Sequence, residues 1–207
     1  GETPEALGTW VRTHIPDRIR PPGQFSAYAN YNAALAGYIV ERVSGTTFDD
    51  YVEKNILTPL GMERTTSRQP APDPLARDMT KVYAYEDGTY RSQPGYDVTL
   101  NAAPAGSVRG TAADMGRFML AHLDDGRYDG RAVLRPETAR LMHSRSFAHD
   151  PRVNGMAHGF WEMDMNGQRV IGHAGSHFIC NSLLMLLPER GLGVFVAANS
   201  LGSMDFV

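Results

Sequence analysis

Apolar side chains recur at helical spacing through the first half of the chain. Leu35, Ile39 and Val43 lie four positions apart, and Gly45 follows as a stop signal, which predicts a helix over about residues 31–43. Periodicity and start signals predict further helices over about residues 48–56, 111–123 and 136–142.

Two other stretches show the apolar–polar alternation of β-strands. After a proline-rich surface loop over residues 67–77, residues 81–85 alternate, an Asp-Gly pair turns the chain, and Tyr90 begins a return strand. Near the C-terminal end, Asn166-Gly167 is a strong hairpin turn signal. Strands are predicted around and after it over residues 160–165, 169–172, 182–187 and 194–198.

This order of elements predicts an α+β protein. We expect a mainly helical lobe over residues 1–150 and an antiparallel sheet meander over residues 151–207.

The composition is that of an ordinary globular protein. Of the 207 residues, 42% are apolar and 21% are charged, and the net charge of −3 gives no electrostatic footprint for nucleic acid. No apolar run approaches the roughly 18 residues that span a bilayer. Cys180 is the one cysteine, so an internal disulfide and a cysteine-based metal site are excluded, and we expect it to be a small core residue.

Both ends of the sequence look cut. Residues 1–5 resemble neither a signal peptide nor the start of a mature domain, and Val207 follows closely on a predicted strand. We therefore expect a domain that is incomplete at both ends.

Three motifs in a fixed order carry the candidate chemistry. They are Pro22-Gly23-Gln24-Phe25-Ser26-Ala27-Tyr28-Ala29-Asn30, then the Gly-rich helix entry Ala105–Met115, then Gly172-His173-Ala174-Gly175-Ser176. Together with Pro59-Leu60-Gly61-Met62, they resemble the serine β-lactamase and penicillin-binding-protein family, of the class C β-lactamase and esterase type. The resemblance covers nearly the whole chain and implies the β-lactamase/transpeptidase-like fold, an antiparallel sheet flanked by helices.

The resemblance also implies a role for each site residue in acyl transfer. Tyr28 is similar to the tyrosine of a Tyr-x-Asn motif and would shuttle protons, and Asn30 would contact a substrate carbonyl. His173 stands where the family has the lysine of its Lys-Thr-Gly box, in a His-x-Gly form. Gly175 would let substrate lie against the strand edge, and the backbone N–H of Ser176 would complete the oxyanion hole. Neither a metal nor an organic cofactor is implied.

Each of these residues also has a structural interpretation. Tyr28 could be a turn tyrosine packed before a helix, Asn30 could cap that helix, and His173 could be a strand histidine with satisfied ring nitrogens. Because His173 titrates, whereas a lysine is permanently charged, and Ala174 lacks the threonine hydroxyl, ester or small-amide hydrolysis is favoured over recognition of a β-lactam carboxylate.

The nucleophile of such an enzyme is missing from this sequence. The resemblance implies a Ser-x-x-Lys motif, but the only lysines, Lys54 and Lys81, are preceded at that spacing by Tyr51 and Asp78. We therefore expect a serine hydrolase fragment that is inactive alone, with a small ester, amide or D-peptide, or β-lactam substrate.

Two other functions compete with this interpretation. The spacing of His173 and His177 would suit a metal site on a helix, but the glycines around them favour a strand. A non-catalytic binding module of the same fold, without a nucleophile, is the other alternative.

The resemblance points to a periplasmic, secreted or membrane-associated protein, although the sequence itself leaves the compartment open. Without its missing segments, the predicted meander would expose an apolar face and an open edge, so we also expect self-association through the sheet.

Overall fold

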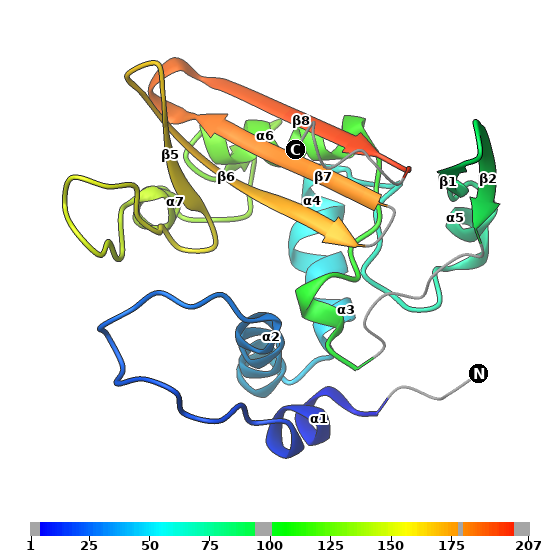
Figure 1. The fold of residues 1–207 in the computed structure, drawn as a ribbon, viewed down its shortest axis with the longest axis horizontal. Helices are drawn as coiled ribbons and strands as arrows, with labels where there is room; N and C mark the ends of the chain where they lie inside the picture. The colour runs from blue at the N-terminus through cyan, green and yellow to red at the C-terminus, as the bar shows by residue number, and fades with distance from the viewer. Residues whose placement is uncertain (1–4, 94–100, 178–179, 201–207) are drawn as a thin grey trace. The chain divides into compact units, whose positions relative to one another are not determined.

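The computed structural model describes residues 5–93, 101–177 and 180–200 (Figure 1). These residues form two compact units. The first takes its described residues from Gly1–Met79 and Tyr96–Thr111, and the second from Thr80–Gly95 and Ala112–Val207. The division differs from the predicted one at residue 150, because α6 (Ala112–Leu123) packs against β8 (Leu192–Ala198) and belongs with the sheet.

The first unit is helical. Its long helix α2 spans Asn30–Ser44, close to the prediction, and ends at Gly45, whose φ of 72° is the left-handed conformation that favours glycine. The remaining helical elements are α1 (Leu7–Thr13), α3 (Phe48–Val52), a π-helical turn (Glu53–Leu57), α4 (Thr58–Leu60), α5 (Asp73–Ala76) and a 3₁₀ turn (Ala103–Ala105). The helix predicted over 48–56 therefore extends to Leu60.

Close packing of α2 against α1 and the 3₁₀ turn forms the core of the first unit. Val11, Ala34 and Ala102 are buried at its centre. A methyl group on Gly37 would lie 2.4 Å from Cγ of Pro104, so glycine is required where α2 meets the 3₁₀ turn.

The second unit is built on a four-stranded antiparallel sheet in the order β5-β6-β7-β8. Its strands are β5 (Trp161–Met165), β6 (Gln168–His177), β7 (Cys180–Leu187) and β8 (Leu192–Ala198). Asn166 and Gly167 have φ values of 55° and 71°, the pair of left-handed residues that a two-residue hairpin turn requires. The predicted meander is confirmed, and β6 extends five residues beyond its predicted end at Gly172.

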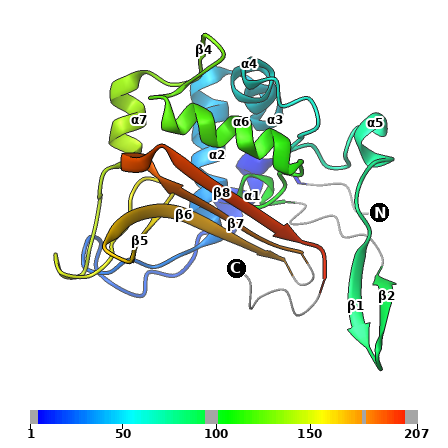
Figure 2. The same ribbon diagram turned by 90° about the horizontal axis from the view of Figure 1, so that it is seen from above.

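One face of the sheet is covered by α6 (Figure 2). Ile171, Leu184 and Leu186 on this face are buried and pack with Met119 of the helix. The other elements of the second unit are the hairpin β1 (Val82–Glu86) and β2 (Thr89–Gln93), the short pair β3 (Arg127–Tyr128) and β4 (Arg131–Ala132), a 3₁₀ turn (Pro188–Arg190) and α7 (Pro136–His143). The α+β class is therefore confirmed. Within the described part of the chain, no helix combines the length and apolar character needed to cross a membrane.

Candidate active site

The His-x-Gly segment lies on β6 just beyond the end of its neighbour β5. The register of β5 with β6 runs from Met165↔Gln168 to Trp161↔Gly172 and stops there, whereas pairing with β7 continues to His177. His173, Gly175 and Ser176 therefore lie along a stretch of β6 that β5 does not accompany. His173 is half-buried, and the other two residues are exposed.

The turn also determines which way the backbone groups of this stretch point. In a two-residue hairpin the residues flanking the turn form a hydrogen-bonded pair, and backbone groups of alternate residues point to the same side of a strand. Gln168 and Gly172 therefore direct their N–H and C=O groups toward β5. By the same alternation, Ala174 and Ser176 direct theirs to that side, beyond the last residue of β5.

Two contacts orient the imidazole of His173. Its ring stacks on the indole of Trp161, with centroids 4.7 Å apart and planes inclined by 27°. Its Nδ1 lies 2.6 Å from the carbonyl oxygen of Ala174. The interpretation of His173 as a strand residue is thus correct for its backbone, while its ring sits at the end of β5.

Glycine is present on either side of His173 for different local reasons. A Cβ at Gly172 would lie 2.3 Å from the carbonyl oxygen of Leu184, a backbone atom of β7 that cannot move aside. At Gly175 the nearest atom is the hydroxyl oxygen of Ser182, at 2.7 Å. Gly172 is therefore required because the backbone of β7 lies so close to it. At Gly175, a side chain would compete for space with the side chain of Ser182.

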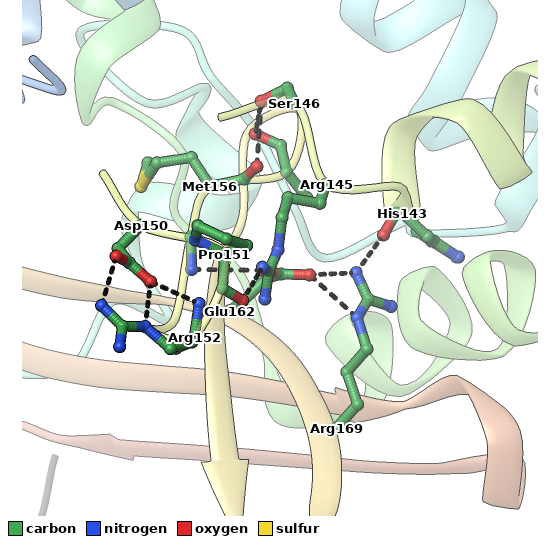
Figure 3. Close-up of polar contacts among 11 residues, drawn as sticks. His143, Arg145, Ser146, Asp150, Pro151, Arg152, Met156, Glu162 and Arg169 are labelled. Carbon is green, nitrogen blue, oxygen red and sulfur yellow. Dashed lines mark hydrogen bonds and ion pairs between the residues drawn. The ribbon is translucent and has the colours of Figure 1, made fainter. Parts of the chain in front are cut away.

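A buried ion cluster fixes the end of β5 next to Trp161. The carboxylate of Glu162 is only 3% exposed and lies between Arg145 and Arg169 (Figure 3). Arg169 Nη2 is 2.7 Å from one oxygen of Glu162, and the N–H of Gly155 donates to the other oxygen at 3.2 Å. Arg169 also donates to the backbone carbonyl of His143, so the cluster joins α7, the loop after it and the sheet.

Opposing effects act on the ionisation of Glu162. Burial favours the protonated acid, but the hydrogen bonds from Arg169 and Arg145 outweigh it and hold the pKa of this carboxyl below its ordinary value. Glu162 therefore acts as a structural anchor that is charged at neutral pH.

Tyr28 and Asn30 lie in the first unit, at the start of α2. Tyr28 is 65% exposed. Asn30 was predicted as a possible cap, and this is wrong: Ala29 has the extended backbone of the cap position, and no side chain caps α2. Asn30 is instead the first helical residue, with an exposed side chain. That Tyr28 and His173 border one cavity stays a prediction.

Other chemically active groups lie elsewhere in the second unit. Cys180 is half-buried, and burial raises the pKa of its thiol, which disfavours the reactive thiolate and agrees with a packing role. Among residues 5–93, 101–177 and 180–200, no group of three or more His, Cys, Asp or Glu side chains is arranged to hold a metal ion. The side chain of His177 lies outside the described residues.

Sequence reasoning missed Trp161, although the signal was present. Counting outward from the Asn166-Gly167 turn pairs residue 165 with 168 and so residue 161 with 172. The hairpin prediction alone therefore puts Trp161 beside the His-x-Gly segment.

Comparisons with known proteins give the family and the fold of this chain. Residues 7–207 match the family model described as Beta-lactamase. Penicillin-binding protein 4 of Amycolatopsis lactamdurans is 31% identical over 191 residues, covering 86% of this chain and 48% of that protein.

Solved structures of similar fold include enzymes and a penicillin-binding homologue. A D-stereospecific amidohydrolase from Streptomyces superimposes with a TM-score of 0.70 and 25% identity, over 90% of this chain and 53% of its own. The octameric penicillin-binding protein homologue from Pyrococcus abyssi gives a TM-score of 0.71 and 24% identity, over 88% and 40%. The chain thus spans about half the length of the proteins it matches, and the predicted β-lactamase/transpeptidase-like fold is confirmed.

Proposed function

We propose, from the premise that this chain belongs to the beta-lactamase family, that it is part of a serine hydrolase that works through an acyl-enzyme. The observation that supports this most directly is the stretch of β6 from His173 to Ser176, which continues past the end of β5. A strand that outruns its neighbour offers backbone groups to an extended substrate.

Ser176 supplies the oxyanion contact in this proposal. Its N–H points to the side of β6 that β5 has left, so a carbonyl oxygen lying along this edge would meet it. A donor fixed in a strand needs no reorganisation as charge develops on the oxygen, and such donors contribute about 2.7–4 kcal/mol to catalysis in known hydrolases.

The other steps are assigned to residues of the first unit and to a nucleophile outside these 207 residues. A serine of a Ser-x-x-Lys motif adds to the substrate carbonyl carbon while Tyr28, as the proton shuttle, takes the hydroxyl proton. Collapse of the tetrahedral adduct expels the alcohol or amine, which takes that proton from Tyr28. Water then attacks the acyl-enzyme in the same way and regenerates the serine. Asn30 would contact a substrate carbonyl.

The proposed substrate is an ester or a small amide of the D-amino-acid type, ahead of a β-lactam. His173 and Ala174 replace a permanent cation and a hydroxyl, so a substrate carboxylate has fewer partners at this edge. The similarity to a D-stereospecific amidohydrolase supports the same class of substrate.

The test is Tyr28→Phe in the full-length protein, assayed with p-nitrophenyl esters and D-amino-acid amides. Loss of the proton shuttle should lower kcat by roughly 100-fold or more. Tyr31→Phe is the matched control, because Tyr31 lies three residues after Tyr28, in the first turn of α2, and its hydroxyl donates to the carbonyl of Val11. Unchanged turnover in Tyr28→Phe would remove this residue from the mechanism.

A binding module is the second candidate, since no Ser-x-x-Lys is present in these 207 residues. A fluorescent penicillin separates the two functions. Covalent labelling of the full-length protein, lost on replacement of its Ser-x-x-Lys serine, supports the enzyme, whereas reversible binding alone supports the module. The 207-residue chain by itself should not be labelled.

A further inference from the structure

Trp161 has no role in the chemistry proposed above, yet it makes the closest ring contact of His173. It is the first residue of β5, and its pair with Gly172 is the β5–β6 pair furthest from the hairpin turn. Its half-buried indole stacks on the imidazole with centroids 4.7 Å apart. An aromatic face in this position restricts rotation of the imidazole about its side-chain bonds.

The Ala174 carbonyl determines which imidazole nitrogen carries the proton. A carbonyl oxygen only accepts, so at 2.6 Å the Nδ1 of His173 must be the donor. A neutral imidazole has one N–H, and its second nitrogen is then an acceptor. The contact therefore selects the tautomer with the proton on Nδ1 and the lone pair on Nε2.

We propose that Trp161 is a positioning residue that holds His173 in this single tautomer. The indole keeps the imidazole in the orientation in which Nδ1 reaches the carbonyl of Ala174. Without the indole, the imidazole could rotate, and either of its nitrogens could face that carbonyl. Trp161 is itself held firmly. The next residue, Glu162, donates its N–H to Gly155 at 2.9 Å and anchors its carboxylate in the arginine cluster (Figure 3).

The consequence for the substrate rests on the proposed function. A ring held in one tautomer and one orientation presents the same surface to each ester or amide substrate at this edge of β6.

The tautomer is measurable in the 207-residue chain without any activity. In the ¹⁵N-histidine-labelled chain, long-range ¹H–¹⁵N correlation at neutral pH should show distinct protonated Nδ1 and unprotonated Nε2 signals for His173, assigned by their loss in His173→Gln. Trp161→Ala should average the two signals, and Trp161→Phe, which keeps an aromatic face, should retain them. Averaged signals in the unsubstituted chain, or unchanged signals in Trp161→Ala, would overturn the proposal.

The chain offers a matched control. Trp10 stacks on His14 in the first unit with centroids 4.8 Å apart, so Trp10→Ala should alter the signals of His14 and leave those of His173 as they are. A change at His173 in this variant would mean that general unfolding, rather than the Trp161 stack, moves the signals.

A second measurement leaves Trp161 in place, in case Trp161→Ala does not fold. Because the chain has two tryptophans, Trp10→Phe makes Trp161 the sole tryptophan. The maximum of its emission should move to longer wavelength in His173→Gln, because loss of the stacked ring exposes the indole to water. The same emission maximum in both proteins would refute the stack.

Failure of this inference and failure of the proposed function are distinguishable. A fixed tautomer in a full-length protein without turnover would retain the positioning role and reject the hydrolase. Turnover with unchanged kcat and KM in Trp161→Ala, together with an unchanged tautomer, would retain the hydrolase and reject the positioning role.

Discussion

Acid should destabilise the second unit through a buried pair of histidines. His122, on α6, is 6% exposed, and its Nδ1 lies 3.0 Å from Nε2 of His143, at the end of α7. The edges of Phe118 and Phe160 contact the His122 ring with centroids 4.6 and 5.4 Å away. One nitrogen of the pair donates and the other accepts, so two N–H groups would face each other in an apolar surrounding once both imidazoles were protonated.

The charged groups around the pair determine the direction of both pKa shifts. Burial, and then the charge of His143, lowers the pKa of His122 from 6.5 to about 4. Burial, and then Arg169, lowers the pKa of His143, while Asp125 acts in the opposite direction. Arg140 neutralises part of the charge of Asp125 at 2.7 Å, and Glu162 does the same for Arg169. Both imidazoles therefore favour the neutral form in the folded protein.

The sign and size of the effect follow from linkage. Above about pH 6.5 the histidines are neutral in both states and contribute no pH dependence. Below it, His122 becomes protonated in the unfolded chain, whereas in the folded protein it stays neutral until about pH 4. At about 1.4 kcal/mol per pH unit, His122 alone should lower the free energy of unfolding by about 2 kcal/mol between pH 7 and pH 5. His143 adds a loss of the same sign.

Urea unfolding at pH 7 and pH 5, followed by circular dichroism, tests this reasoning. His122→Phe removes the titrating group and places a ring of similar size among Phe118 and Phe160, so its pH-dependent loss should be smaller by about 2 kcal/mol. His158→Asn, at an exposed position of the same unit, should leave the loss as it is. Equal losses in the unsubstituted chain and in His122→Phe would refute the assignment.

Two further predictions concern the sheet. Glu162→Gln leaves Arg145 and Arg169 without their buried counter-charge, and should lower the free energy of unfolding by about 3–5 kcal/mol in a urea titration; a loss under 1 kcal/mol would show that the cluster is not an anchor. Val194 and Val196 are 43% and 42% exposed on the face turned away from α6, so their joint replacement by lysine should abolish concentration-dependent association in sedimentation velocity. A monomeric unsubstituted chain at all concentrations would contradict the self-association expected from the sequence.

The sheet was predictable because its determinants are local. Asn-Gly at 166–167 selects the turn, the turn sets the register, and alternation along the next two strands follows from it. The C-terminal end of β6 was harder to predict from the sequence, because Gly172 and Gly175 weaken the strand pattern there. Pairing with β7 extends the strand regardless, since each residue to His177 gains a partner on that side.

The helical part shows where local signals mislead. Asn30 has the right chemistry for a cap, but Ala29 takes the cap conformation and Asn30 begins the helix. The helix predicted to end near residue 56 runs on to Leu60, because Pro59 lies in the first turn of α4, which starts at Thr58 directly after the π-helical residues and where its missing N–H costs little. The candidate site residues were proposed from the order of the motifs, and local patterns carry no information on how residues distant in the sequence lie relative to one another.

The candidate site depends on a mismatch in strand length. β5 has 5 residues and β6 has 10, and a two-residue turn starts both from the same end. The excess therefore falls entirely at the far end, where the His-x-Gly segment lies. A register slip of one residue would move every side chain of β5 to the opposite face, taking Glu162 away from its arginines. Because the buried carboxylate penalises such a slip, the same cluster that stabilises the sheet also fixes the position beyond which β6 continues without β5.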